Sequence, residues 1–133
     1  MGETVTILII EDDPEVALLL MDILDERGFS ASRALDPERI PADIRPSLIL
    51  TDLYGAPWYD VEQAAMQVAS LRARFPGVAI VVVTAYGEAG RDLVAIGADA
   101  IVPKPFDIES LIELVSAHVL PAHRARLGAH TGA

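Results

Sequence analysis

The chain has 133 residues, a length that suits one globular domain. Apolar residues make up 52% of it, which argues against a disordered chain, and the absence of cysteine excludes disulfides, thiol catalysis and thiolate metal sites. Twenty acidic residues against ten basic ones give a net charge of -10, which disfavours direct binding to nucleic acid or anionic membranes, because both require cationic side chains.

The chain opens with a predicted strand followed by a helix. Val5–Ile10 is a short, continuous, β-branched apolar run, which is typical of a parallel strand buried on both faces. Asp13 can cap the following helix, Pro14 suits its first position and Gly28 comes just past its end. The apolar face of this helix is predicted to consist of Ala17, Leu20, Met21 and Leu24.

The middle of the chain continues the alternation. Ser30–Leu35 is a weaker strand candidate, expected near a sheet edge, and Leu48–Thr51 has the character of a buried strand. Between them, Asp36–Pro46 contains three prolines, so any helix there is limited to about one or two turns. Asp60 can cap the next helix, with Gln63 completing a capping box. Its apolar stripe is expected to be Val61, Ala64, Val68, Leu71 and Phe75.

The last part of the chain holds two strands and two helices. Val78–Val83 is predicted to be a buried strand, and Ala100–Pro103 a weaker one. Gly87–Ile96 contains two glycines, each of which weakens a helix interior by roughly 1 kcal/mol, so this helix should be short and loosely held. Asp107 can cap a final helix with apolar residues at Ile108, Leu111, Ile112, Val115 and Val119. We expect residues 121–133 to be a C-terminal tail or linker stub after a domain over residues 1–120.

Strands and helices therefore alternate along the chain. Such alternation predicts an α/β fold, with a doubly wound five-stranded parallel sheet, helices on both faces and right-handed crossovers. In sheets of this kind, functional sites form at the carboxyl ends of the strands.

Polar residues come directly after four of the predicted strands: Glu11, Asp12 and Asp13 after the first, Asp52 after the third, Thr84 after the fourth and Lys104 after the fifth. Because parallel strands end at one edge of the sheet, these side chains should meet there. Clustered carboxylates suit Mg²⁺, and one of them can attack a phosphoryl group whose charge the metal, the ammonium and the hydroxyl stabilise. Each residue alone has an ordinary structural role, and their joint occurrence favours a site.

Taken in order, these motifs resemble the receiver domain of two-component response regulators. The resemblance covers residues 5–120 and is carried by ILIIEDDPEVALLL, LILTDL, VVVTA and GADAIVPKPF. It implies a flavodoxin-like sheet with strand order 2-1-3-4-5, and a bacterial signalling phosphoprotein. It also implies that Asp52 accepts the phosphoryl group, that Lys104 contacts it, that Thr84 turns its hydroxyl towards it, and that the peptide bond before Pro105 is cis.

The resemblance further implies a magnesium site. Asp12, Asp52 and the backbone carbonyl of Tyr54 would bind Mg²⁺ directly. Glu11 would act on the metal through water, and Asp13 would serve as the helix cap.

Several positions depart from the family's pattern. Ile101 stands where the family usually has an aromatic residue coupled to the hydroxyl, and Tyr86 is a candidate substitute. The loop after the phosphoacceptor is LYGAPWYDV, in which Pro57 is displaced by one position and no glycine follows Asp60. We therefore expect the signal to be transmitted differently from the usual way, which uses the hydroxyl–aromatic pair.

Three aromatic residues near the site have two interpretations each. Tyr54 and Tyr86 occupy positions that border the pocket in this family, where they either shield an acyl phosphate from water or merely cover apolar surface. Trp58 is either a local staple or part of a partner surface.

Two other functions stay open. A degenerate receiver would bind partners without phosphorylation, but the strand-end residues are all present. A haloacid-dehalogenase-like phosphohydrolase needs a second carboxylate two residues after the first, where this chain has Tyr54. We expect slow loss of phosphate from Asp52 at most, without steady enzymatic turnover.

The partners implied are a histidine kinase or histidine phosphotransfer protein, and an output protein or a missing effector domain, with a homodimer left open. Direct contact with nucleic acid or membrane is not expected. No signal peptide or membrane-length apolar run is visible, so we expect a cytoplasmic protein. The chain is expected to be either a stand-alone receiver or a fragment of a longer regulator.

Overall fold

The computed structural model describes residues 5–53 and 58–131, with side chains described as far as residue 119. Within these ranges, five parallel strands form one sheet in the order β2-β1-β3-β4-β5. The strands are β1 (Thr6–Ile10), β2 (Ser30–Ala34), β3 (Leu48–Thr51), β4 (Ala79–Thr84) and β5 (Ala100–Pro103). The predicted α/β fold and its strand order are confirmed.

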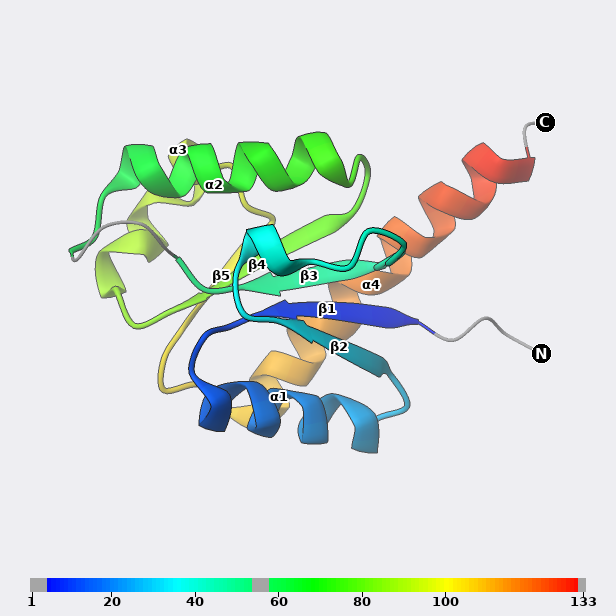
Figure 1. The fold of residues 1–133 in the computed structure, drawn as a ribbon, viewed down its shortest axis with the longest axis horizontal. Helices are drawn as coiled ribbons and strands as arrows, with labels where there is room; N and C mark the ends of the chain where they lie inside the picture. Colours follow the sequence, from blue (N-terminus) through cyan, green and yellow to red (C-terminus); the bar gives the residue numbers. More distant parts are fainter. Residues whose placement is uncertain (1–4, 54–57, 132–133) are drawn as a thin grey trace.

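Helices cover both faces of the sheet (Figure 1). One face carries α1 (Pro14–Glu26) and α4 (Ile108–Thr131), and the other carries α2 (Val61–Arg74) and α3 (Leu93–Ile96). In the described connections lie two short 3-10 helices, η1 (Pro37–Arg39) and η2 (Gly87–Asp92).

Two apolar clusters, one on each side of the sheet, hold the layers together. Along β1, Ile7 and Ile9 belong to the cluster that includes residues of α1 and α4, whereas Leu8 and Ile10 belong to the one that includes residues of α2. Side chains alternate between the two faces of a strand, so a continuous apolar run supplies both clusters at once. This accounts for the lack of polar alternation in the predicted strands.

Local capping sets where the helices begin and end. The Asp13 carboxylate accepts the N–H of Glu15 at 2.9 Å, and the Asp60 carboxylate accepts that of Glu62 at 2.9 Å. Just past α1, Gly28 adopts φ +87°, a left-handed conformation that favours glycine. The predicted start and end of the first helix are confirmed, and its start places Asp13 directly beside the acidic pair that precedes it.

The largest differences from prediction lie in the last helix. α4 continues past residue 120 to Thr131, so the stretch expected to be a tail or linker is helical that far despite Pro121. Ile108 is 43% exposed instead of lying on the apolar face, since it is the first residue of α4 and full burial begins at Leu111. The domain boundary at residue 120 stays a prediction. The segment after β4 is short and only partly α-helical, as its two glycines predict.

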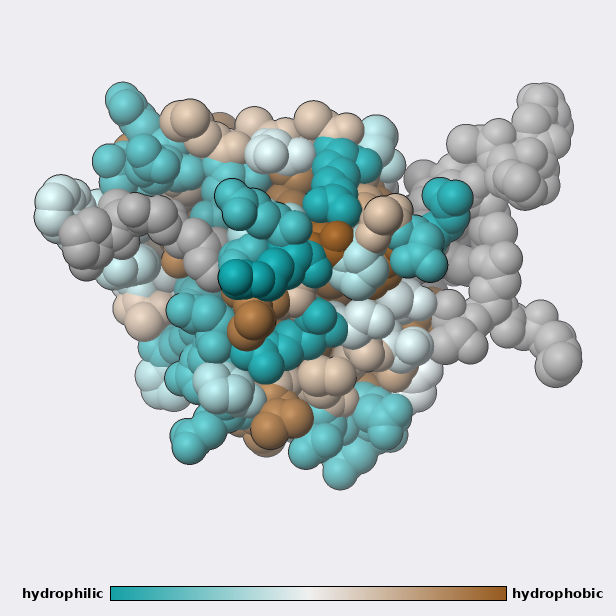
Figure 2. Space-filling view, in the orientation of Figure 1, coloured by the Kyte–Doolittle hydropathy of each residue, from teal (hydrophilic) through white to brown (hydrophobic). Residues whose placement is uncertain are grey.

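The face of the molecule shown in Figure 2 is largely hydrophilic, with hydrophobic residues in small separate spots. Several hydrophobic side chains of the described residues are open to solvent, among them Val94 at 93%, Trp58 at 69% and Met66 at 66%. Among the described helices, none is both long and apolar enough to cross a membrane.

Candidate functional site

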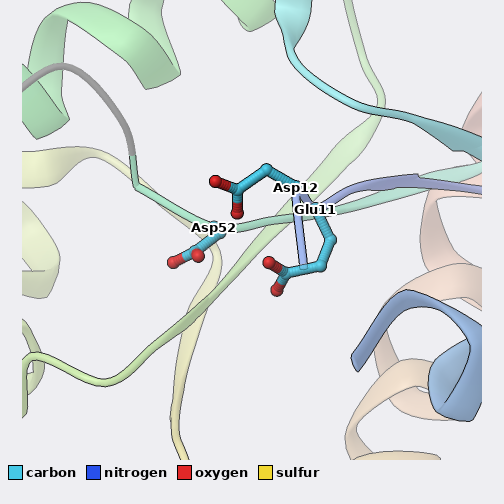
Figure 3. Close-up of side chains that lie close together, drawn as sticks. All are labelled: Glu11, Asp12 and Asp52. Carbon is cyan, nitrogen blue, oxygen red and sulfur yellow. The ribbon is translucent and has the colours of Figure 1, made fainter. Parts of the chain in front are cut away.

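Three carboxylates from two strand ends meet at the carboxyl edge of the sheet. Glu11 and Asp12 follow β1, and Asp52 follows β3. Figure 3 shows their side chains converging, and one oxygen of each lies within 4.8 Å of the others. Glu11 is buried, Asp12 is exposed and Asp52 is half-buried. Such a set of hard oxygen donors fits a magnesium ion in its chemistry and its spacing.

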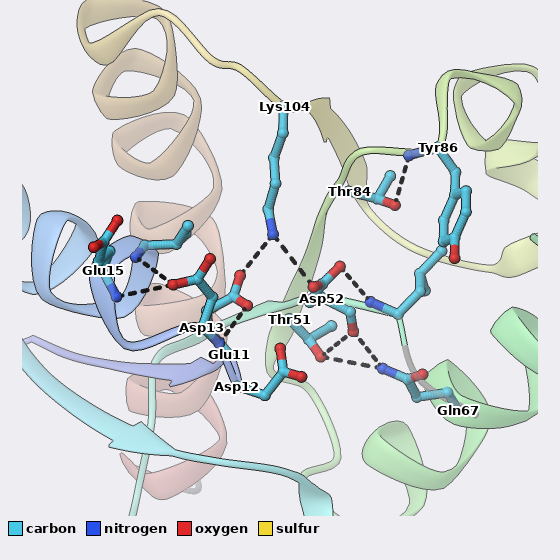
Figure 4. A network of polar contacts seen from close by, with 12 residues as sticks. Glu11, Asp12, Asp13, Glu15, Thr51, Asp52, Gln67, Thr84, Tyr86 and Lys104 are labelled. Carbon is cyan, nitrogen blue, oxygen red and sulfur yellow. Dashed lines mark hydrogen bonds and ion pairs between the residues drawn. The ribbon is translucent and has the colours of Figure 1, made fainter. Parts of the chain in front are cut away.

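Lys104, after β5, supplies the counter-charge (Figure 4). Its Nζ lies 2.7 Å from Glu11 Oε1 and 3.2 Å from Asp52 Oδ2. It is the only lysine in the sequence. Burial lowers the pKa of Lys104, but the hydrogen bond to Glu11 and the charge of Asp52 outweigh it and hold that pKa above its usual range. Lys104 therefore carries a full positive charge between two carboxylates.

Glu11 is the most buried acid of the group. Burial raises the pKa of Glu11, and the charge of Asp52 adds to the rise, whereas hydrogen bonds from Lys104 and from the N–H of Asp13 oppose it. The Asp13 N–H donates to Glu11 Oε2 at 3.1 Å. The net effect is a raised pKa, because the two donors only partly replace the water that burial removes.

Arg33 supports the acidic pair from the neighbouring strand and was missed by sequence reasoning. Its Nε donates to the carbonyl oxygen of Glu11 and its Nη2 to that of Asp12, each at 3.1 Å. Arg33 lies on β2, which pairs with β1 in parallel register. In the sequence, the role of Arg33 is indicated only by its charge, which stands out in a strand of otherwise small residues.

The hydroxyl of Thr84 also lies at this edge, at the end of β4. Thr84 is fully buried, and its Oγ1 accepts the N–H of Tyr86 at 3.1 Å. Its carbonyl accepts the N–H of Lys104 at 2.8 Å, which ties the ends of β4 and β5 together. The structure thus places the hydroxyl beside the loop that carries Tyr86.

A second tyrosine, also missed from the sequence, lies against Tyr86. The rings of Tyr59 and Tyr86 are 5.8 Å apart at 37°, and the Tyr59 hydroxyl donates to Asp92 Oδ2 at 2.7 Å. Burial, with the hydrogen bond to Asp92, raises the pKa of Tyr59 to about 12. Ile101 stands at the position where the resemblance implies an aromatic residue. It is half-buried and packs against the cluster on the α2 side of the sheet.

The remaining predicted positions fall into two groups. The Lys104–Pro105 peptide bond is cis, as the resemblance implies. Tyr54 and Pro57 lie outside the described residues. The structure therefore brings together Glu11, Asp12, Asp52 and Lys104, with Thr84 and Tyr86 beside them.

Solved structures of response regulators share this fold. A response regulator from Thermotoga maritima matches with a TM-score of 0.75 and 20% identity, over 88% of this chain and 98% of that one. The response regulator TrrA from the same organism, solved in complex with Mg²⁺ and BeF, matches with a TM-score of 0.70 and 26% identity, over 86% and 98% of the two chains.

One curated relative extends the comparison to sequence. The nitrogen assimilation regulatory protein NtrX of Azorhizobium caulinodans is 29% identical over 127 residues, which are 90% of this chain and 27% of the relative. The chain thus spans about a quarter of that relative's length. No protein-family model matches the chain. The chain therefore has the fold of response-regulator receiver domains and is similar in sequence to TrrA and to part of NtrX.

Proposed function

We propose that Asp52 accepts a phosphoryl group from a histidine kinase or a histidine phosphotransfer protein. The observation that carries this proposal is the position of Lys104, whose ammonium lies 3.2 Å from Asp52 Oδ2 and 2.7 Å from Glu11 Oε1. A lone structural carboxylate needs no such neighbours. A nucleophile that must receive a dianionic group needs a nearby cation and a metal site.

In the proposed reaction a carboxylate oxygen of Asp52 attacks phosphorus, and the bond from phosphorus to the donor's imidazole nitrogen breaks. The electron pair leaves on that nitrogen, and the product is an acyl phosphate. Lys104, which forms an ion pair with Asp52, would contact the incoming phosphoryl oxygens. The hydroxyl of Thr84, which now accepts the N–H of Tyr86, would turn towards the new group.

Glu11, Asp12 and Asp52 are the residues that would hold Mg²⁺. When bound, the ion would offset the charge of the carboxylates and of the phosphoryl oxygens. The TrrA structure, with Mg²⁺ and BeF bound, supports this assignment by similarity of fold. The backbone carbonyl of Tyr54 stays a proposed further ligand.

The output is proposed to be a changed protein-binding surface. Receiver domains are in general switches without steady turnover, and we expect the same here, with slow loss of phosphate. The segment Gly87–Ile96 is built from a 3-10 helix and one α-helical turn, so a small free-energy difference can shift it. We expect an output protein or an effector domain to bind that surface. The proposed location of the protein is the cytoplasm.

Incubation with acetyl phosphate and Mg²⁺, followed by intact mass spectrometry, tests the proposal. Wild type should gain one phosphoryl group that hydroxylamine removes, and EDTA should prevent the gain. Asp52→Asn should show no gain, whereas Asp22→Asn, an exposed carboxylate on α1, should behave as wild type. Equal labelling of both variants, or no labelling of wild type, would contradict the proposal and favour a receiver that binds partners without phosphorylation.

A further inference from the structure

A side chain of α2 reaches the backbone of the phosphoacceptor. Gln67 Nε2 donates at 2.6 Å to the carbonyl oxygen of Asp52 and at 3.2 Å to Thr51 Oγ1 (Figure 4). We propose that Gln67 is a positioning residue for phosphorylation, which orients the Asp52 carboxylate through the peptide group that follows it. This inference rests on the proposed function of Asp52.

The carbonyl of Asp52 lies just beyond the regular sheet. The ladders that β3 forms with β1 and β4 both end at Thr51, which pairs with Ile10 on one side and Val82 on the other. The Asp52 carbonyl is bonded by side chains: it accepts the Thr51 hydroxyl at 2.8 Å as well as the Gln67 amide. Side chains therefore set the direction of this carbonyl where strand pairing no longer does.

That direction is passed on to the carboxylate. A peptide group is planar, so a fixed Asp52 carbonyl also fixes the N–H of Leu53 on its other side. The Leu53 N–H donates to Asp52 Oδ1 at 2.8 Å. With Oδ1 held there, Oδ2 lies 3.2 Å from Lys104 Nζ. The amide on α2 is thus connected to the nucleophile through one rigid peptide group and one hydrogen bond.

The position of Gln67 on its helix suits this role. It is half-buried, directly before the buried Val68 and three residues after the buried Ala64, so it borders the apolar stripe that faces the sheet. Thr51, its other acceptor, is 1% exposed. Gln63, one turn earlier on α2, is exposed and makes a matched control. A polar side chain at the sheet side of the helix keeps the donor within reach of the strand end.

Phosphorylation rates of four variants test the proposal. Gln67→Met keeps the length of the side chain and removes the donor, Gln67→Glu keeps its shape and removes the donor, Gln63→Met is the control, and Thr51→Val removes the second donor to the same carbonyl. Initial rates are measured by intact mass against acetyl phosphate concentration, at saturating Mg²⁺ and at a temperature where circular dichroism shows every variant folded.

Both Gln67 variants should lose about three- to tenfold in maximal rate, the effect of one hydrogen bond, with the half-saturating concentration of acetyl phosphate unchanged. The control should keep the wild-type rate. The double variant Thr51→Val with Gln67→Met should lose less than the product of the single losses, because both donors act on one carbonyl.

Amide hydrogen exchange of Leu53, measured by NMR, gives a second readout that does not depend on phosphorylation. It should be faster in both Gln67 variants than in the control. Rates of the Gln67 variants within twofold of the control, or a rate loss without a change at Leu53, would overturn the positioning role. If wild type is not phosphorylated, the proposed function fails, and exchange at Leu53 still decides whether Gln67 orients this peptide.

Discussion

Lys104 and Glu11 are 93 positions apart in the sequence, and their side chains form a 2.7 Å ion pair at the carboxyl edge of the sheet. The Glu11 side chain is 3% exposed and that of Lys104 is 19% exposed. A charge pair this sheltered from water is costly to break, because the remaining partner stays in a poorly solvated place.

Replacing Lys104 by Met should therefore destabilise the metal-free protein by about 3 kcal/mol. Urea unfolding in EDTA measures the loss. Mg²⁺ should restore more stability to this variant than to wild type, since the ion can take over the role of the missing cation. Arg27→Met, which removes an exposed ion pair with Glu109, is the control and should cost less than about 1 kcal/mol. Equal losses in the two variants would show that Lys104 is not held as the structure indicates.

Magnesium should stabilise the folded chain through Asp12. At a concentration 100 times its dissociation constant, the ion should add about 2.7 kcal/mol to the free energy of unfolding of wild type. Asp12→Asn should lose most of that gain, because Asp12 belongs to the carboxylate cluster. Asp13→Asn is a closely matched control, since asparagine also caps helices well and Asp13 caps α1. Thermal unfolding with and without Mg²⁺ compares the three proteins, and an equal response in both variants would count against the site.

The Tyr59–Asp92 hydrogen bond should make stability depend on alkaline pH. The pKa of Tyr59 is raised to about 12 in the folded chain, above its ordinary value, so the folded state holds this proton more tightly. The resulting stabilisation is complete below about pH 10, the ordinary pKa, and is lost as the pH rises to about 12.

The free energy of unfolding of wild type should therefore fall more steeply over this interval than that of Tyr59→Phe, as urea titrations at each pH would show. At neutral pH, Tyr59→Phe should be less stable by about 1 kcal/mol. Tyr86→Phe leaves the bond to Asp92 in place and should retain the wild-type steepness. Parallel curves for wild type and Tyr59→Phe would rule out the predicted linkage.

Thr84→Val should destabilise the loop that follows β4. It removes the acceptor of the Tyr86 N–H, and a part-buried donor without an acceptor costs about 1–2 kcal/mol. Thr84→Ser retains the acceptor and serves as the control, with a smaller loss. Urea unfolding gives the free energies, and amide exchange at Tyr86 should be faster in the valine variant alone. Similar exchange in both variants would mean that the hydroxyl does not hold this loop.

Much of the site could be predicted because it depends on strand ends. Short, continuous apolar runs mark where the strands stop, and the residues that follow them, such as Asp52 and Lys104, necessarily reach one edge of a parallel sheet. This reasoning needs only the order of the elements. It does not need the register between strands or the rotation of any helix.

The residues that were missed depend on those finer relations. Arg33 acts because β2 pairs with β1 in a register that brings its guanidinium to two carbonyls. Gln67 acts because the rotation of α2 points it at β3, and Tyr59 because its loop approaches Asp92. A half-buried polar residue leaves no periodic signal in a sequence. Pro121 is a related case, since proline usually ends a helix, yet α4 passes it.

Lys104 is the only lysine in the sequence, and it lies inside the site. This has a practical consequence. Reagents that modify primary amines have two targets on this chain, the α-amino group and Lys104. Reductive methylation with ¹³C-formaldehyde would place one NMR label next to Asp52, whose shift should report metal binding and phosphorylation directly. For the same reason, coupling the chain to a sensor surface through its amines risks blocking the site, and attachment through an engineered cysteine avoids this, because the sequence contains no cysteine of its own.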